Sequence, residues 1–235
     1  MKTKMKTHHA LCGLLSGLLL LAAGTAQTHA GLLVPAAAGS QLYVANYNNN
    51  TVDKITPGGV GSLFANTGMS GPHDLAFDSA GNLYVANFAV GLGTTIEKFT
   101  PGGVGSVFAS TGLSGPVGLA FDGAGDLYAA NWTTNTIEKF TPGGVGSLFA
   151  NTGLSTPFGL AFDGAGNLFA SNVGNNTIEK FSSVGADLGV FADSSDGLNQ
   201  PAFLAFAPAP EPTSAALLLG SGAMLLLRRR RAAAR

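Results

Sequence analysis

The sequence predicts an all-β fold, a small β-propeller of about four four-stranded blades within residues 42–206. The pentapeptide Leu-Tyr-Val-Ala-Asn at 42–46 returns in close variants that begin at residues 83, 127 and 168, so the repeating unit is 41 to 44 residues long. Each unit contains four short runs typical of strands, and a four-stranded repeat of this length is the pattern of propeller blades. Gly, at 34 copies, is abundant and charged residues make up only 11% of the chain. This composition fits short strands joined by tight turns.

Each unit is expected to fold as a meander of four strands. In the third unit these strands are expected at 118–122, 127–131, 136–140 and 147–150. The first two strands lack a clean alternation of polar and apolar residues, which predicts burial on both faces. The first turn, 123–126, contains Gly and Asp, which tolerate positive φ. Pro142-Gly143-Gly144 predicts a type II turn with positive φ at Gly143.

The two ends of the repeat region predict how the ring closes. The chain enters at the second strand type, at Leu42, without a preceding first strand. Residues 200–206 resemble that missing strand, so we expect them to complete the first blade and close a ring of four blades. An open arc, or two chains that form one larger ring, are the alternatives. An open arc would leave a strand edge exposed to pairing with other chains.

The first 30 residues are predicted to be a secretion signal. Three lysines within residues 2–6 precede an apolar run at 11–24, and Ala26 and Ala30 are candidate cleavage points. The alternative is a transmembrane anchor, but the apolar run is shorter than the ~20 residues that a spanning helix needs. The only cysteine, Cys12, lies inside this segment, so the mature chain has no thiol. Residues 31–41 are expected to be a linker.

The charge of the predicted mature domain excludes one class of partner. The whole chain carries a formal net charge of −1, but eight of its 12 basic residues lie in the two terminal segments. Between residues 31 and 209 there are four lysines and twelve acidic residues, which gives a net charge of −8. Such a field repels phosphate backbones, so we expect no nucleic-acid partner.

The repeat itself resembles a known family. The pattern Gly-Leu-Ala-Phe-Asp-x-x-Gly-Asn-Leu-Tyr-Val-Ala-Asn, followed by Ile-Glu-Lys-Phe, is similar to the NHL repeat and to related gluconolactonase-like propellers across 42–206. The resemblance implies a propeller fold. It also implies either a binding platform or, in some relatives, a metal-dependent hydrolase or lyase. Propellers of this kind commonly have six blades, so a count of four departs from the pattern.

The C-terminal segment, 207–235, resembles a sorting signal. Pro210-Glu211-Pro212 is followed by an apolar run at 215–227 and then by four consecutive arginines. These basic residues are Arg228, Arg229, Arg230 and Arg231. The order is similar to the PEP-CTERM signal, which implies cleavage by an exosortase in a Gram-negative bacterium that makes extracellular polysaccharide.

Physical reasoning about this segment agrees with a temporary anchor. The 15 residues 213–227 would form a helix about 22 Å long, against a hydrocarbon core of about 30 Å. The arginines would hold the end of the helix on the cytoplasmic side. A tail anchor that is never cut is the alternative.

Candidate site residues are few. His73 and Asp74 stand where the next blade has Val117 and Gly118, so we expect that the fold does not need them and that they mark a ligand or metal site near the axis. Trp132, the single tryptophan, is a second candidate as a ring that stacks on a sugar. One asparagine ends the same strand in every unit, and these side chains are candidates either for turn hydrogen bonds or for Ca²⁺. They are Asn46, Asn87, Asn131 and Asn172.

These observations favour an exported surface or extracellular-matrix protein whose propeller is a non-catalytic binding or structural module. The alternatives are a metal-dependent gluconolactonase-like hydrolase or lyase, and a structural spacer without a ligand. No resident cofactor is expected apart from a candidate Ca²⁺. The expected partners are the secretion machinery, an exosortase-type enzyme, and extracellular polysaccharide or surface proteins. The chain is expected to be anchored transiently in the inner membrane and then to reach the cell surface or matrix.

Overall fold

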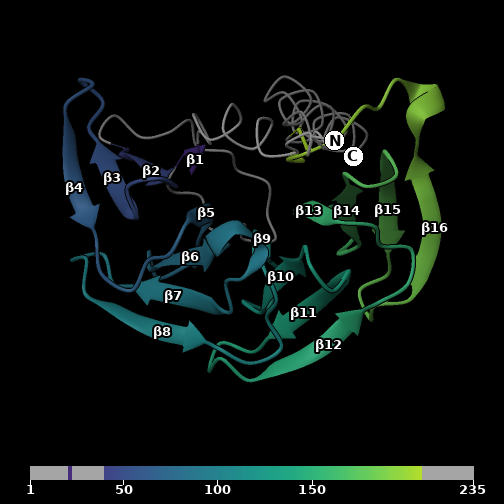
Figure 1. Cartoon of the computed structure of the whole chain (residues 1–235), viewed down its shortest axis with the longest axis horizontal. Coiled ribbons are helices and arrows are strands. Elements are labelled where there is room, and N and C mark those ends of the chain that lie inside the picture. Colours follow the sequence, from purple (N-terminus) through teal and green to yellow (C-terminus); the bar gives the residue numbers. More distant parts are fainter. Residues whose placement is uncertain (1–20, 23–39, 208–235) are drawn as a thin grey trace, which may run out of the picture.

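The computed structural model of the chain describes residues 21–22 and 40–207, which form β-strands joined by short loops and two single-turn 3-10 helices. The strands make four sheets that follow one another around a common axis (Figure 1), so the predicted small propeller of four-stranded blades is confirmed. In the described part of the chain, no helix is long and apolar enough to cross a membrane. The helix predicted within 215–227, the sorting motif and most of the predicted secretion signal lie outside the described residues.

Each sheet is one blade, in which consecutive strands pair in antiparallel fashion. Blade 1 contains β1 (Leu21–Ala22), β2 (Leu42–Asn46), β3 (Thr51–Ile55) and β4 (Gly61–Ala65). Blade 2 contains β5 (Pro72–Phe77), β6 (Leu83–Asn87), β7 (Thr95–Phe99) and β8 (Gly105–Ala109). Blade 3 contains β9 (Pro116–Phe121), β10 (Leu127–Asn131), β11 (Thr136–Phe140) and β12 (Gly146–Ala150). Blade 4 contains β13 (Pro157–Phe162), β14 (Leu168–Asn172), β15 (Thr177–Phe181) and β16 (Asp187–Ala192). The first strand of each blade is the innermost one.

Two recurrent turns connect the strands of a blade. After the innermost strand of blade 3, the Asp122 carboxylate accepts hydrogen bonds from the backbone N–H groups of Ala124 and Asp126 at 2.9 Å, as expected for an Asp that ends a strand. The predicted type II turn is wrong in its detail. The positive φ, 81°, lies at Gly144 instead of Gly143, and the Gly144 N–H donates to the Thr141 carbonyl. A turn with a left-handed glycine just after it is typical of hairpin loops whose bulge matches the twist of the strands.

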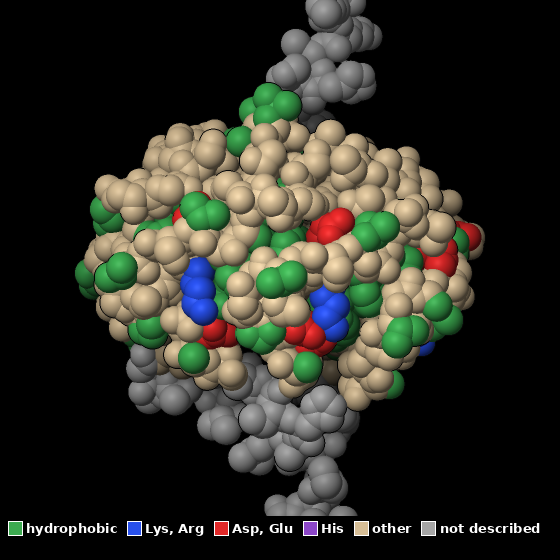
Figure 2. All heavy atoms as spheres, turned by 90° about the horizontal axis from the view of Figure 1, so that it is seen from below, with side chains coloured by type: hydrophobic (Ala, Val, Ile, Leu, Met, Phe, Trp, Pro, Cys, Tyr) green, Lys and Arg blue, Asp and Glu red, His purple; other side chains and the backbone are tan. Residues whose placement is uncertain are grey.

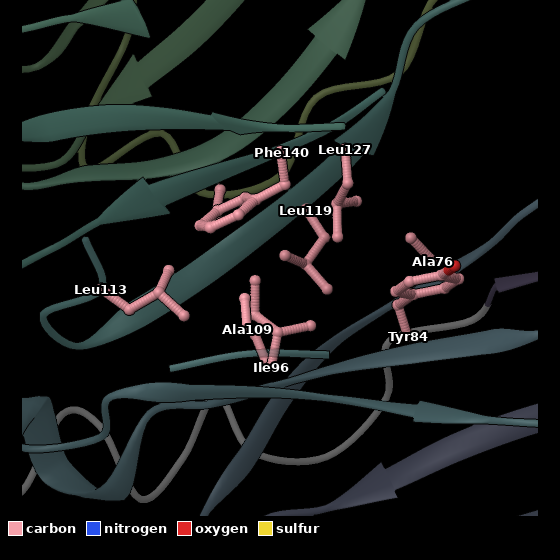
Figure 3. Packing of buried hydrophobic residues seen from close by; sticks show 10 residues of the cluster. Ala76, Tyr84, Ile96, Ala109, Leu113, Leu119, Leu127 and Phe140 are labelled. Carbon is pink, nitrogen blue, oxygen red and sulfur yellow. The ribbon is translucent and has the colours of Figure 1, made fainter. Parts of the chain in front are cut away.

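The core lies between successive blades. The second strands of blades 2, 3 and 4 are buried at all five positions, which confirms burial on both faces. Figure 3 shows the cluster between blades 2 and 3, where Leu119 and Leu127 of one sheet face Ile96 and Tyr84 of the other. The Tyr84 ring meets Phe121 of the next innermost strand edge to face, at 5.0 Å between centroids. Equivalent ring contacts recur from blade to blade, so this packing helps to hold successive blades together.

The outer surface carries few charges. Figure 2 shows basic side chains directly beside acidic ones, separated by scattered apolar groups. One of these pairs joins Lys139 to Asp126 at 2.8 Å, and another joins Lys98 to Asp78 at 3.8 Å. Exposed pairs of this kind contribute about 0–1 kcal/mol each. The surface charges therefore add little to the stability of the fold.

The predicted closing strand lies elsewhere than expected. One edge of β2 pairs with β3, and the other edge pairs with β1, where Leu21 lies opposite Tyr43. Residues 200–206 do not pair with β2. Residues 201–207 form no strand and pack beside blade 4, where the Phe206 ring contacts Phe169. Figure 1 shows blades 1 and 4 at opposite ends of an arc, so the described sheets do not close a ring.

Candidate functional site

The residues singled out in the sequence gather at one end of the axis. The innermost strand begins where the second strand of the same blade ends, because the two are antiparallel. Pro72 therefore lies opposite Asn87, Pro116 opposite Asn131, and Pro157 opposite Asn172. The residue after each proline and the residue after each asparagine meet there. His73 and Trp132 do not pair with each other, but both contact Phe88 and Phe158 there. Asp74 instead contacts Leu119 of the neighbouring strand.

The recurrent asparagines hold loops in place. The Asn87 Oδ1 accepts from the Ser70 N–H at 3.0 Å, and its Nδ2 donates to the Gly68 carbonyl and to the Thr95 hydroxyl, both at 2.8 Å. Asn131 and Asn172 make the equivalent three hydrogen bonds with distances of 2.8 to 3.0 Å. Asn46 donates instead to Thr51 and Asp53. The side-chain oxygens of Asn87, Asn131 and Asn172 thus serve the loops that end at the axis, which agrees with the turn alternative.

Five aromatic side chains converge at this end, and we call them the axial aromatic cluster. They are His73, Phe88, Trp132, Phe158 and Phe203. The His73 ring lies 4.9 Å from Phe158, 5.4 Å from Phe88 and 6.1 Å from Phe203. The Trp132 ring lies 6.1 Å from Phe88 and 5.8 Å from Phe158. Most of these contacts are edge to face, the arrangement that aromatic quadrupoles favour.

The rings of the cluster differ in their exposure to solvent. Phe88 is buried, Trp132 and Phe158 are half-buried, and Phe203 retains 42% of its accessible surface. The rings come from blades 2, 3 and 4 and from the C-terminal segment, so only the assembled blades bring them together. Small-molecule sites are likewise lined mainly by apolar and aromatic side chains with a few polar groups, within a cleft or cavity.

His73 is the titratable side chain within the cluster. Burial lowers its pKa to about 4, and a hydrogen bond to the Val117 carbonyl opposes this shift. The imidazole is therefore neutral at neutral pH. Its Nδ1 lies 3.3 Å from the Val117 carbonyl oxygen, which can only accept, so Nδ1 carries the proton. The other nitrogen, Nε2, is then a hydrogen-bond acceptor.

Asp74 has a different position and role. Its side chain is buried, with 5% of its surface exposed, and it accepts from the N–H groups of Leu75 and Leu119, both at 2.8 Å. Burial raises its pKa to about 7, while the two backbone donors lower it. Leu119 lies on the innermost strand of the next blade. The comparison of repeats did not reveal this structural contact, in which the Asp74 carboxyl joins two blades.

No group of three or more His, Cys, Asp or Glu side chains that could hold a metal occurs in residues 40–207. The cluster contributes one imidazole, and the nearest carboxyl, Asp74, is engaged with the backbone. The proposal of a metal at His73 and Asp74 gains no support from this geometry.

The sequence reasoning missed most of the rings. Phe88 and Trp132 follow the recurrent asparagine of their units, as Tyr47 does in the first unit, but only the unique Trp132 was singled out. Phe158 occupies the same repeat position as His73. An aromatic residue at one repeat position in three of four units was the signal that could have found the cluster.

Comparison with known proteins gives a likeness of fold. A virginiamycin B lyase from Staphylococcus aureus superposes with a TM-score of 0.61 at 20% identity, over 75% of this chain and 62% of the lyase. A gluconolactonase from Xanthomonas campestris gives a TM-score of 0.59 at 20% identity, over 71% and 62% of the two chains. An inactive form of the staphylococcal lyase bound to quinupristin gives 0.58 at 17% identity, over 70% and 55%. The likeness is one of fold.

The match is partial in length as well as in identity. This chain spans about three fifths of the length of the lyase and the gluconolactonase. No family model matches the sequence, and no curated protein matches it. The gluconolactonase- and lyase-like propeller architecture is therefore shared, and the activities of those proteins do not follow from it.

Proposed function

We propose that this chain is an exported propeller that binds a neutral polysaccharide. One sugar ring of that polymer would contact the axial aromatic cluster. The observation that carries the proposal is the meeting of four apolar rings, from three blades and the C-terminal segment, in one cluster with the imidazole of His73. The apolar face of a sugar ring can stack on Trp132 or Phe158. A hydroxyl of that sugar can donate to Nε2 of His73.

The negative charge of the domain favours neutral polysaccharides over anionic ones as ligands. With a net charge of −8 between residues 31 and 209, the domain repels polymers rich in uronic acid. A neutral glucan avoids this repulsion, and its recognition by aromatic rings needs no ionic partner. Neutral extracellular polysaccharide is therefore the proposed class of ligand.

Trp132 allows a direct test because it is the only tryptophan in the chain. Titration of the protein with soluble neutral glucan oligosaccharides should change the tryptophan emission and saturate. Phe158→Ala should weaken this binding at least tenfold, whereas the matched control Phe191→Ala, on the exposed outer strand β16, should leave it unchanged. An emission spectrum that stays constant up to millimolar sugar would overturn the proposal and favour a structural spacer.

Export and sorting belong to the same proposal and rest on the terminal sequences. We propose that the first 26 or 30 residues are removed on secretion and that an exosortase-type enzyme cuts near Pro210-Glu211-Pro212. Intact-mass measurement of the protein recovered from the cell surface checks both cuts. A surface protein that keeps Arg235 would overturn the sorting part.

A metal-dependent hydrolase or lyase is the second candidate, and the similar structures favour it over a binding module. Two of those proteins are described as a lyase and a gluconolactonase. The assay is turnover of gluconolactone, and of quinupristin, with Ca²⁺, Mn²⁺ or Zn²⁺ and with a chelator. Turnover that needs a metal and is lost in His73→Val would establish the enzyme. Sugar binding without turnover would leave the binding module.

A further inference from the structure

The C-terminal segment occupies the place of an innermost strand. Phe206 meets Phe169 at 5.0 Å between centroids, and the equivalent pairs in the other blades have distances of 4.9 to 5.0 Å. The Gln200 N–H donates to Asn176 Oδ1 at 2.7 Å, as the Thr156 N–H does to Asn135 Oδ1 at 2.6 Å. Residues 201–206 therefore sit against blade 4 as β13 sits against blade 3.

This segment has no blade of its own. In blades 2, 3 and 4 the innermost strand pairs along its length with the second strand, whereas residues 201–206 form no strand pair. As a result, Phe203 and Phe206 retain 42% and 48% of their accessible surface. At this end of the arc, residues 201–206 occupy the position of an innermost strand but have no second strand with which to pair.

At the other end of the arc, blade 1 has a very short innermost strand. This strand, β1, has two residues where β5 has six. The five residues of β2 are also less covered than those of β6, β10 and β14, because only Tyr43 is buried. β1 lies within the proposed secretion signal, so its removal on export would free the edge of β2.

Residues 201–206 and β2 could pair as the innermost and second strands do in blades 2, 3 and 4. Leu75 lies opposite Val85, Leu119 opposite Ala129, and Leu160 opposite Ala170. The same register places Leu204 opposite Val44. Blades 1 and 4 lie at opposite ends of the open arc in Figure 1, so the end of one arc can meet the beginning of a second.

We propose that two copies of the mature chain join end to end, residues 201–206 of each copy serving as the innermost strand of blade 1 in the other. This proposal rests on the proposed removal of the secretion signal. Two such junctions give a closed dimeric ring in which the inner edge of β2 is paired in both copies. The dimer also covers Phe203 and so completes the wall beside the axial aromatic cluster.

Engineered cysteines test the junction, in a background where Cys12→Ser removes the native thiol. Val44→Cys and Leu204→Cys are placed on separate, differently tagged copies of the full chain, which are co-expressed and exported to the oxidising periplasm. We expect a disulfide-linked heterodimer on a non-reducing gel. In the control, Ala45→Cys replaces Val44→Cys. Neighbouring residues of a strand face opposite sides, so this pair should not cross-link.

The outcomes separate the dimer from its alternatives. A chain with both Val44→Cys and Leu204→Cys that runs as a compact cross-linked monomer, with no heterodimer from the separate copies, would overturn the dimer in favour of closure within one chain. Processed chains without any cross-link would overturn the junction in every form. The intact mass reports signal removal independently, so a heterodimer that keeps its first 30 residues would contradict export but not the junction.

Discussion

Neighbouring blades meet at the axis in two different ways. Between blades 2 and 3, the Asp74 carboxyl reaches across and accepts the Leu119 N–H. Between blades 3 and 4 the equivalent position is Gly118, where an added Cβ would lie 1.9 Å from the Phe158 carbonyl oxygen. One junction thus uses a side chain to span the gap, and the other brings the two backbones into contact. Asp74 of blade 2 and Gly118 of blade 3 thus provide two different ways to connect an innermost strand to the next blade.

The junction between blade 4 and the C-terminal segment combines both solutions. A Cβ on Gly159 would lie 2.4 Å from the Ala202 carbonyl oxygen, so the backbones are again close. In addition, the Ser171 hydroxyl accepts from the Gly159 N–H at 2.8 Å and donates to the Ala202 carbonyl. Blades 2 and 3 have Ala86 and Ala130 at the position of Ser171. Each junction can therefore be weakened by a single substitution.

Gly118→Ala should have the largest effect, because backbone atoms cannot move aside as a side-chain end can. We expect a loss of about 3 kcal/mol or more in the free energy of unfolding, at the upper end for overpacking. Urea denaturation measures it. Gly164→Ala is the matched control, since no atom lies within 4 Å of its added Cβ. Equal stability of the two variants would show that blades 3 and 4 are not held in close contact.

Asp74→Ala should come next, because it leaves the buried N–H of Leu119 without an acceptor. A buried donor that loses its partner costs about 1–3 kcal/mol. Asp74→Asn keeps one acceptor oxygen and should lose less. Thermal unfolding at pH 7 compares the three proteins. If Asp74→Ala unfolds at the temperature of the parent, the carboxyl does not join the blades.

His73→Val copies blade 3 and should change the pH dependence of stability. The pKa of His73 is about 4 in the folded protein and 6.5 as its ordinary value. Between these values the unfolded chain binds the extra proton, so the parent loses stability as the pH falls below about 6.5. At pH 5 this loss is about 2 kcal/mol. The variant should lack it, so its advantage over the parent should grow from pH 7.5 to pH 5 in urea titrations. If the difference in the free energy of unfolding between variant and parent stays constant over this pH range, the pKa of His73 is not lowered by burial.

Ser171→Ala should have the smallest effect, about 1 kcal/mol for one hydrogen-bonded hydroxyl. It copies blades 2 and 3 while it leaves the close approach of Gly159 to Ala202 unchanged. Because the substitution affects only the last junction, amide hydrogen exchange should speed up at Gly159 and not at Gly118. Exchange that accelerates in all three junctions would indicate that the blades unfold as one unit.

The repeats allowed the strands to be predicted well. Residues 127–131 and 136–140 were expected as strands and are β10 and β11, because alternation and turn residues act locally. The turn at Asp122 also followed from its own side chain. The turn at 141–144 did not, because both glycines can adopt positive φ and the twist of the hairpin selects the second.

The candidate site was predicted less completely. His73 and Trp132 stood out because each is unusual among the repeats, and both belong to the cluster. Phe88 and Phe158 did not stand out, since a phenylalanine in a strand-rich sequence normally belongs to a core. Their meeting around His73 depends on the positions of three separate sheets. For Asp74 the comparison of repeats found the irregular residue but not its partner, Leu119, which lies 45 positions along the chain.

The sequence alone determined the repeat, its four strands, the acidic balance of the folded part and the polar residues that end each strand. These features depend on neighbouring residues and on composition. The tertiary structure decided which blades touch and where residues 201–206 lie. It also decided that Asp74 and Gly118, at equivalent positions, make different contacts with the next blade. These outcomes depend on the curvature of the arc, which is set by the packing of whole sheets against one another and is not encoded at any single repeat position.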